Sequence, residues 1–461
     1  MMNLSTTKHL VSHPKVIKGE NFIIFILLFL LAFFLRFYKF TELPPLDGFG
    51  FEEFQTAEYS LLLLQNSAFF FSQYFSLEHL ITNLLPSLTF LLFGVDAFTL
   101  RLPFVIIGSL TIPFFYLLAR EVTTPFAAIF SSLLFLLARW HIFGSRIADE
   151  LFTGIFIEVL LLYSLVKAVK SRKLLYYLLT GLLTGFLAYE YFGYRLGIVI
   201  IPLSIVFLYI KTAAYDNNKV ILHCTLRNVL VYFVATILVC YPLLSAFTNG
   251  NDLLIEGFRR QANNRLGGGF TPLDTLIREN KFDILPNQKI IQDRLLPTFK
   301  AFFLQGSGIP ELGSTTPLLD PATGALFMLG YVYILLTFRK PWRFIIFAWI
   351  TIALIVAAFF PTNFYPGRFT TVMPFIFLLI GFLVSDISSF LLTKQKGRML
   401  IIGTSSVVIL FVGIHNLRTL FVYQIQDSSV LGAFHTSRDS GYCSQKKINA
   451  WICENQGYFK R

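Results

Sequence analysis

Long uninterrupted apolar runs recur from one end of the chain to the other, and they limit the fold more than any other feature. The runs reach roughly 17–25 residues, the length that a helix needs to cross about 30 Å of hydrocarbon. The 461 residues are 55% hydrophobic and only 14% charged, which excludes an ordinary soluble domain. A transmembrane barrel would instead show short alternating strands. The sequence therefore predicts an all-α integral membrane protein.

The apolar runs predict about eleven membrane-spanning helices. They lie at roughly 22–39, 98–118, 125–143, 151–168, 174–190, 195–211, 227–247, 317–338, 342–360, 368–391 and 399–421. The first run continues directly into Arg36 without the small residues of a cleavage site, so we expect it to remain as a span. The predicted membrane domain covers residues 1–423, and a short tail follows at 424–461.

Lysine and arginine collect in alternate connections between the predicted spans, which indicates the orientation. With the N-terminus inside, every inside connection is basic, whereas the outside turns 144–150, 190–195 and 361–368 hold one arginine each. We therefore interpret the net charge of +12 as a topology signal and not as a nucleic-acid footprint. This orientation places two long segments, about 40–97 and 248–316, and the tail on the extracytoplasmic side of the cell membrane.

Two acidic pairs, Glu52-Glu53 and Asp149-Glu150, closely follow apolar runs. Carboxylates this near to membrane spans are costly unless they face water, a cation or a reactant. The predicted orientation places both pairs at the same face of the membrane. An alternative interpretation of the first pair is helix capping, because a glycine-containing turn precedes it and a helix N-terminus favours negative charge. The stretch that follows this pair is amphipathic and suits the membrane interface.

Five segments, in order along the chain, carry a resemblance to a known family. They are Phe-Glu-Glu-Phe-Gln-Thr-Ala at 51–57, Gly-Val-Asp-Ala-Phe-Thr-Leu-Arg-Leu-Pro at 94–103, the Trp-His and Ser-Arg-Ile-Ala residues within 138–150, Tyr-Glu-Tyr-Phe-Gly-Tyr-Arg at 189–195 and Gly-Arg-Phe-Thr at 367–370. With them the chain resembles the multi-spanning glycosyltransferases of the GT-C fold that use polyprenyl-phosphate sugars, close to protein O-mannosyltransferases and lipid A aminoarabinose transferases. Glu52 stands where that family usually has Asp. The likeness is good across about the first 210 residues and thin afterwards.

The resemblance implies a GT-C fold and an inverting transfer, by direct displacement, of a sugar from a polyprenyl-phosphate donor to a hydroxyl group of a protein, a lipid or a glycan. Such a transfer needs a base for the incoming hydroxyl and cations for the departing phosphate. The candidate catalytic carboxylates are Glu52, Glu53 and Asp149. The candidate substrate-binding residues are Arg101, Arg146, Glu150, Tyr191, Arg195 and Arg368. A guanidinium fork suits phosphate oxygens, although an arginine at a span end often only reaches for lipid headgroups.

Three questions stay open. A divalent cation is an option, since His79 could join a carboxylate as a ligand, but an interfacial histidine is the simpler interpretation. Cys443 and Cys453 could close a small disulfide loop in an oxidising compartment. The alternative function is a transporter or flippase of lipid-linked sugars, proteins that usually show internal repeats and polar residues near mid-membrane. This chain shows no repeat, and Glu158 is the main charged residue inside a predicted span.

Overall fold

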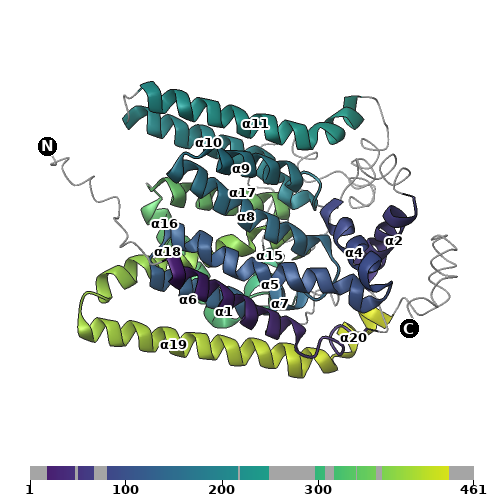
Figure 1. Ribbon diagram of the computed structural model, residues 1–461. Coiled ribbons are helices and arrows are strands. Elements are labelled where there is room, and N and C mark those ends of the chain that lie inside the picture. Colours follow the sequence, from purple (N-terminus) through teal and green to yellow (C-terminus); the bar gives the residue numbers. More distant parts are fainter. Residues whose placement is uncertain are drawn as a thin grey trace, which may run out of the picture.

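The computed structural model describes residues 18–46, 50–66, 80–215, 219–248, 296–306, 316–338, 340–359 and 366–435. In these ranges the regular elements are helices, and most of them run alongside one another in one bundle (Figure 1). The predicted all-α fold is therefore confirmed.

The helices are α1 (Lys18–Phe37), α2 (Phe51–Gln65), α4 (Leu80–Phe93), α5 (Ala97–Val122), α6 (Pro125–Leu136), α7 (Arg139–Gly144), α8 (Glu150–Ser171), α9 (Leu174–Leu187), α10 (Leu196–Tyr215), α11 (Lys219–Thr248), α15 (Leu296–Phe303), α16 (Pro321–Thr337), α17 (Pro341–Phe359), α18 (Met373–Leu391), α19 (Gln395–Arg418) and α20 (Ser428–His435). Two short 3-10 helices, η2 (Phe192–Arg195) and η6 (Pro366–Val372), precede α10 and α18.

All eleven stretches predicted as spans are helical over most of their length. Among the described residues, seven helical segments are long and apolar enough to cross a membrane: Gly19–Phe37, Ala97–Val122, Glu150–Ser171, Gly193–Ile210, Leu226–Leu243, Phe369–Leu391 and Gln395–Gln426. The other four predicted spans coincide with α6, α9, α16 and α17, whose apolar stretches are shorter. The chain is a multi-pass membrane protein, and the count of eleven spans stays a prediction.

One predicted span, at 125–143, is not a continuous helix. α6 ends at Leu136, and α7 begins only at Arg139. The side-chain amide of Asn416, on α19, donates a hydrogen bond to the carbonyl of Leu137 at 3.1 Å. Backbone groups freed by a helix break inside a membrane need such a partner from a neighbouring helix. The interruption is therefore stabilised by tertiary contact, which apolar periodicity cannot reveal.

Short polar residues begin several of the helices. Asp96 accepts a hydrogen bond from the backbone N–H of Thr99 at 2.6 Å at the start of α5. Asp320 accepts one from the backbone N–H of Thr323 at 2.9 Å at the start of α16. Such N-caps satisfy N–H groups that have no partner within the helix, and they complement the helix dipole. Acidic residues before the spans thus have a structural task in addition to any chemical one.

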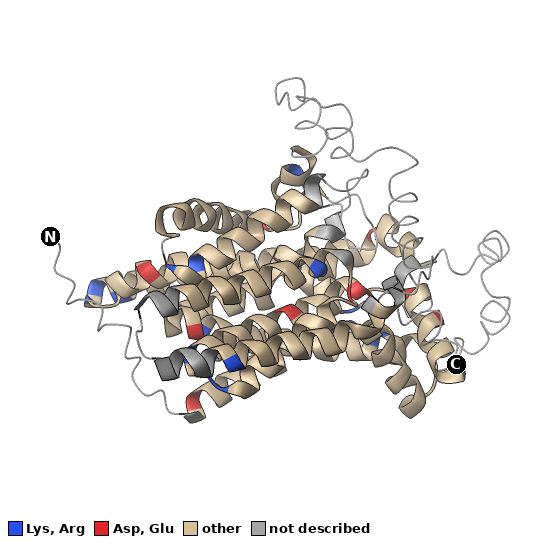
Figure 2. Ribbon diagram, turned by 90° about the horizontal axis from the view of Figure 1, so that it is seen from above, with Lys and Arg blue, Asp and Glu red and all other residues tan. Residues whose placement is uncertain are grey.

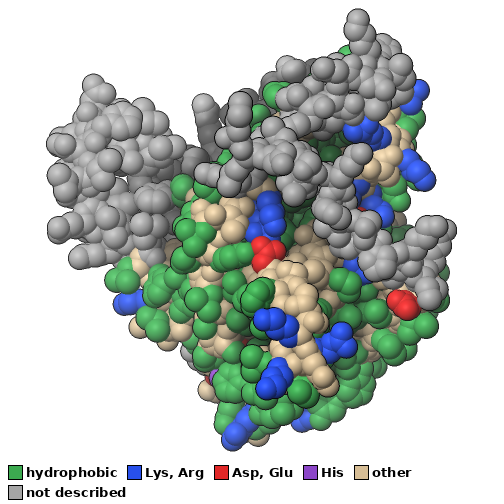
Figure 3. All heavy atoms as spheres, turned by 90° about the vertical axis from the view of Figure 1, so that its left-hand side faces the viewer, with side chains coloured by type: hydrophobic (Ala, Val, Ile, Leu, Met, Phe, Trp, Pro, Cys, Tyr) green, Lys and Arg blue, Asp and Glu red, His purple; other side chains and the backbone are tan. Residues whose placement is uncertain are grey.

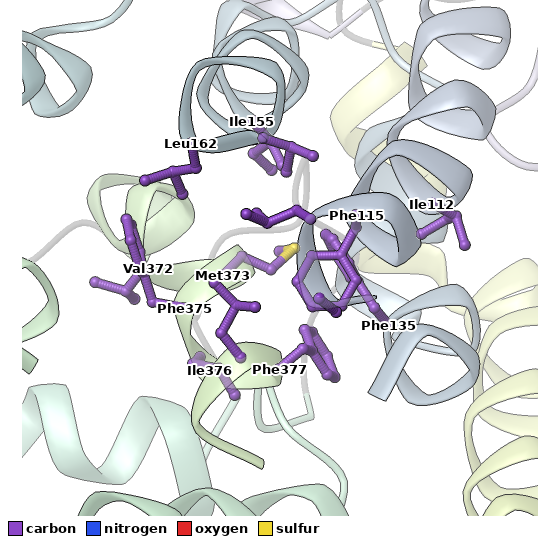
Figure 4. Close-up of a cluster of buried hydrophobic side chains, with 14 of the residues drawn as sticks. Ile112, Phe115, Phe135, Ile155, Leu162, Val372, Met373, Phe375, Ile376 and Phe377 are labelled. Carbon is purple, nitrogen blue, oxygen red and sulfur yellow. The ribbon is translucent and has the colours of Figure 1, made fainter. Parts of the chain in front are cut away.

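The spans that contain α8 and α18 form the centre of the bundle. In an apolar 18-residue stretch of each of these spans 72% and 67% of the residues are buried, as are 67% in that of α5, against 22% in those of α1, α11 and α19. Phe377 of α18 stacks on Phe135 of α6 with ring centroids 4.7 Å apart, and Phe115 of α5 meets Phe135 edge-on at 5.0 Å (Figure 4). Because α18 is apolar on all sides, burial on every side suits it best.

The outer helices present large apolar side chains to their surroundings. Phe22 and Leu27 of α1 and Leu238 of α11 are 66%, 60% and 68% exposed. Charged residues lie mostly toward the ends of the helices, with long uncharged stretches between them (Figure 2). A surface of this kind is stable in contact with lipid tails, which agrees with the multi-pass reading of the sequence.

The segment predicted as the first outer loop contains two helices, α2 and α4, which pack against each other at one end of the bundle (Figure 1). Serine hydroxyl groups of each helix donate hydrogen bonds to the backbone of the other. Ser60 Oγ donates to the carbonyl of Asn83, and Ser87 Oγ donates to the carbonyl of Ser60, both at 2.9 Å. The sequence predicts α2 but not α4, because the apolar run of α4 has 14 residues, too few for a span.

Candidate active site

The two ends of the bundle differ in their charged residues. Figure 3 looks onto the end where α1 begins, and Lys and Arg side chains are spread over its described surface. Lys167 and Lys170 form ion pairs there with Glu121, at N–O distances of 2.8 and 3.2 Å. The opposite end carries α2 and α4 together with the starts of α5 and α8 (Figure 1). The structure places both predicted acidic pairs at this opposite end.

Glu53 joins three segments of the chain through its carboxylate. Arg101 donates Nε to Oε1 at 2.7 Å and a terminal nitrogen to Oε2 at 2.8 Å. The backbone N–H of Ala148 donates to Oε1 at 3.0 Å, and that of Gly50 donates to Oε2 at 3.1 Å. The residue is 2% exposed. These four donors use the roughly four lone-pair positions that a carboxylate offers. We call this arrangement of Glu53, Arg101, Gly50 and Ala148 the Glu53 junction.

Arg101 is fully buried and also holds the chain that leads into α2. Its second terminal nitrogen donates to the carbonyls of Pro44 and Pro45 at 3.2 and 2.9 Å. Its bidentate pairing with a carboxylate is among the strongest hydrogen-bonded arrangements in proteins. The structure therefore brings two predicted site residues, Arg101 and Glu53, together with each other.

Glu52 lies in the first turn of α2, and its side chain is outside the described residues. Glu53 reaches back to the N–H of Gly50 as the acidic residue of a capping box does. The capping interpretation, which the sequence leaves open for the pair, thus applies to Glu53. Because Glu53 also binds Ala148, the backbone of Glu52 is held near the segment that leads into Asp149.

Asp149 and Glu150 begin α8 and are nearly buried, at 3% and 7% exposure. One carboxylate oxygen of Asp149 accepts the backbone N–H of Leu151 at 2.8 Å, so Asp149 is the N-cap of α8. Asp149 also interacts electrostatically with Tyr194 of η2. The hydroxyl of Tyr194 donates to the carbonyl of Leu151 at 2.5 Å. The start of α8 therefore links the second acidic pair to the turn at η2.

Arg146 is fully buried beside two aromatic rings. Its guanidinium carbon lies 5.9 Å from the ring centroid of Phe40 and 5.3 Å from that of Phe421. One terminal nitrogen donates to the carbonyl of Lys39 at 2.5 Å. Burial, with Arg101 nearby, lowers the pKa of Arg146 to about 9, so the group stays charged at neutral pH. Its Nε and other terminal nitrogen have no hydrogen-bond partner among the described residues.

Arg195 and Arg368 lie in η2 and η6, two short helices that contact each other, and η6 also packs on α8. Arg195 donates Nε to the carbonyl of Ala188 at 3.1 Å. Tyr191, just before η2, is 4% exposed. The side chain of Arg368 is outside the described residues. The elements that carry these two arginines are thus brought together beside α8, whereas Arg101 and Arg146 neighbour each other near α2.

Two buried contacts at this end are absent from the predicted site. Glu190 is fully buried and accepts a hydrogen bond from the hydroxyl of Thr82, on α4, at 3.0 Å. A terminal nitrogen of Arg36, near the end of α1, lies 2.6 Å from Nδ1 of His141 on α7. The sequence signal for both is a charged residue bordering an apolar run. That signal does not name the partner, because the partner lies far along the chain.

Among the described residues, no three His, Cys, Asp or Glu side chains gather as metal ligands would. His79, Cys443 and Cys453 lie outside those residues. The divalent cation and the disulfide therefore stay predictions. Cys240 is a buried free cysteine, as expected for a small apolar residue in a span.

Residues 80–239 match the family model described as dolichyl-phosphate-mannose-protein mannosyltransferase. The matched range contains Arg101, the acidic pair at the start of α8 and the turn at η2. No curated protein sequence matches this chain.

Two solved structures are similar in fold. The oligosaccharyltransferase of Archaeoglobus fulgidus aligns with 96% of this chain and 60% of its own length, at 14% identity and a TM-score of 0.54. ArnT from Cupriavidus metallidurans, bound to undecaprenyl phosphate, aligns with 91% of this chain and 76% of its own length, at 15% identity and a TM-score of 0.53. This chain therefore spans well under two thirds of the archaeal enzyme and about three quarters of ArnT. At such low identity these likenesses show a shared fold.

Proposed function

We propose that this chain, whose residues 80–239 match the model of the dolichyl-phosphate-mannose-protein mannosyltransferase family, transfers a sugar from a polyprenyl-phosphate donor to a hydroxyl acceptor. Two observations support this donor. The family description names a dolichyl-phosphate sugar, and the similar ArnT structure holds undecaprenyl phosphate. The acceptor is a protein, a lipid or a glycan hydroxyl.

The observation that carries the proposal is the Glu53 junction. It binds the first turn of α2 to the start of α5 and to the segment before α8. Glu52 and Asp149, two of the three candidate catalytic carboxylates, are thereby held at one end of a membrane bundle. A reaction between a membrane-embedded lipid phosphate and an aqueous hydroxyl requires a site at this depth, where the spans end.

Glu52 is the base in this proposal. Its carboxylate takes the proton of the acceptor hydroxyl as the acceptor oxygen attacks the anomeric carbon of the sugar. The bond from that carbon to the donor phosphate breaks, and polyprenyl phosphate leaves with the bonding electrons. A single displacement of this kind inverts the anomeric carbon. Asp149 is the alternative base.

Glu53 has a positioning role, because its oxygens already accept four hydrogen bonds and none is left for an acceptor proton. Arg101, which pairs with Glu53, acts with it. This assigns the two residues to the geometry of the site, whereas the sequence-based list treats Glu53 as catalytic and Arg101 as substrate-binding.

The donor phosphate lies beside η2 and η6 in this proposal, where Arg195 and Arg368 come from adjoining elements. Glu150 and Tyr191 flank the same region at the start of α8 and before η2. Arg146 contributes its positive charge from a buried position next to Arg101. Preorganised cations at a developing phosphate charge are an effective form of transition-state stabilisation.

We place the site on the extracytoplasmic face of the cell membrane. The support is the distribution of charge: Lys and Arg gather at the end opposite to the Glu53 junction (Figure 3), and basic residues favour the cytoplasmic side.

The test is transfer from a radiolabelled polyprenyl-phosphate sugar by the purified protein in nanodiscs. Glu52→Gln should reduce the rate on the order of 10²–10⁴-fold, the usual cost of losing a general base. Glu58→Gln, on the same helix, is the matched control and should transfer at the parent rate. A Glu52→Gln variant that folds and transfers normally would move the base to Asp149. A parent protein that carries labelled lipid across the bilayer but never releases polyprenyl phosphate would instead support the flippase.

A further inference from the structure

A small pocket opens at the basic end of the bundle, far along the helices from the Glu53 junction. It lies between the end of α8, the first turn of α9, the stretch of α10 from Ile205 to Tyr209 and Val229 of α11. Arg172, Tyr177 and Tyr209 contribute polar groups to its wall, and Val169, Ile205 and Val229 contribute apolar surface. Its enclosed space is small, about 20 Å³, and it opens to the surroundings. The pocket can therefore take a single charged group of a ligand at its mouth and not a whole lipid.

The pocket sits at the depth of lipid headgroups. Three of the helices around it belong to candidate membrane spans, which end near it at Ser171, Ile210 and Leu226. Large apolar side chains of α10 and α11 face outward beside it, with Ile210 60% and Leu230 62% exposed. A ligand with a polar head in the pocket could therefore lay its tails along these helices.

The backbone around Arg172 is built to hold this residue in place. Arg172 has φ 56°, the left-handed conformation, and it ends α8. The side-chain amide of Asn228, on α11, donates to the carbonyl of Arg172 at 2.8 Å. Asn228 is 1% exposed. A left-handed residue costs free energy for a non-glycine side chain, so a tertiary contact of this kind is needed to fix it.

Positive charge is in excess around the pocket. Arg172 is followed by Lys173, which precedes α9 without a side-chain cap, and Arg227 lies close by on α11. Lys173 and Arg227 are exposed and form no ion pair with a carboxylate that the structure describes. The N-terminus of α9 adds the positive end of a helix dipole. Among the described residues near these cations, the acid Glu121 is already bound to Lys167 and Lys170.

We propose that this pocket binds the headgroup of an acidic glycerophospholipid, with the phosphodiester at Arg172 and the acyl chains on the outer faces of α10 and α11. Basic pockets between membrane helices on the cytoplasmic side are typical sites for acidic lipid headgroups. Tyrosine at the same level supplies hydroxyl donors and an aromatic ring suited to the interface. The site is separate from the sugar-transfer site and does not depend on the proposed reaction.

Native mass spectrometry of the full chain in mild detergent, titrated with phosphatidylglycerol or phosphatidylcholine, tests this proposal. We expect one phosphatidylglycerol to remain bound at low lipid concentration, with phosphatidylcholine held more weakly. Arg172→Asn removes the charge, and asparagine tolerates the left-handed backbone. It should weaken phosphatidylglycerol binding on the order of tenfold, as the loss of one charge-assisted hydrogen bond does. Arg398→Asn is the control, an exposed arginine of the basic turn that begins α19.

Equal binding of the two lipids, or equal weakening by the two variants, would overturn the site. Displacement of phosphatidylglycerol by millimolar inorganic phosphate would show a soluble-anion site and overturn the lipid as occupant. Preferential retention of undecaprenyl phosphate over phosphatidylglycerol would overturn it as well. If Arg172→Asn does not fold, Tyr209→Phe is the test of the site. It removes one hydroxyl from the pocket wall, and it should weaken the binding of phosphatidylglycerol but not that of phosphatidylcholine.

Discussion

The carboxylate of Glu53 is surrounded by donors from three segments, and its main partner Arg101 is fully buried. Removing one member of a buried ion pair leaves the other charge without compensation. At the scale of single residues, the Glu53 junction is therefore the most sensitive point of the candidate site.

Arg101→Met should lower the free energy of unfolding by about 3–5 kcal/mol, because it leaves the buried Glu53 unpaired. Arg120→Met, at the other end of the same helix, is the control and should change stability far less, since Arg120 is only half-buried. Thermal unfolding in detergent measures both. Adding Glu53→Gln to Arg101→Met should recover part of the loss. Similar midpoints for the two single variants would show that the pair is unimportant for the fold.

The outer arginines separate into two groups by environment. Arg195→Lys and Arg368→Lys should raise the donor concentration needed for half-maximal transfer, since lysine lacks the planar fork that grips a phosphate. A lost charge-assisted hydrogen bond is worth about 1.5–3 kcal/mol. Arg146→Lys should instead lower the unfolding midpoint, because it loses the contacts with Phe40 and Phe421. Unchanged donor dependence in the first two variants would leave these arginines as headgroup anchors.

α9 and α11 pack closely against each other at a glycine. A Cβ atom added at Gly181, on α9, would lie 2.4 Å from the carbonyl oxygen of Tyr232 on α11. Small residues at such crossings let two membrane helices approach closely. The contact between α9 and α11 thus depends on the absence of one methyl group.

Gly181→Ala should destabilise the protein by about 1–3 kcal/mol, the usual cost of overpacking. Gly403→Ala, on α19, provides the matched control, since a Cβ there meets nothing within 4 Å. It should be neutral or slightly stabilising, because alanine is the better helix former. Thermal midpoints of the two variants are to be compared in the same detergent. An equal response would mean that α9 and α11 can separate without cost.

The elements could be predicted from the sequence wherever a long apolar run fixes a helix, as for α1, α5 and α8. The break at Leu137 could not, because the amide that stabilises it belongs to Asn416, far along the chain. The same limit applies to the site. Its acidic pairs are visible as charges beside spans, but the pairing of Glu53 with Arg101 has no periodic signature. Local sequence patterns indicate where the helices lie, whereas the role of a residue depends on the partners that the tertiary structure gives it.

Across the whole molecule, the predicted orientation follows from the contrast between the basic end, which Figure 3 shows, and the opposite end with the acidic pairs. In a variant with the four native cysteines changed to serine, Ser428→Cys should react with an impermeant maleimide in intact cells. Lys396→Cys, at the basic end, should react only after lysis. Both positions are exposed. The reverse pattern would show that the protein has the opposite orientation in the membrane, with the transfer site on the cytoplasmic side.

One buried carboxylate and its arginine join Pro44, Pro45 and Gly50, the first turn of α2, the start of α5 and the approach to α8. We therefore expect these parts to move together as one rigid unit. A donor with a long hydrocarbon tail must still enter and its product must still leave. We expect the opening for that traffic at the facing side, where η6 packs on α8 and η2 packs on η6.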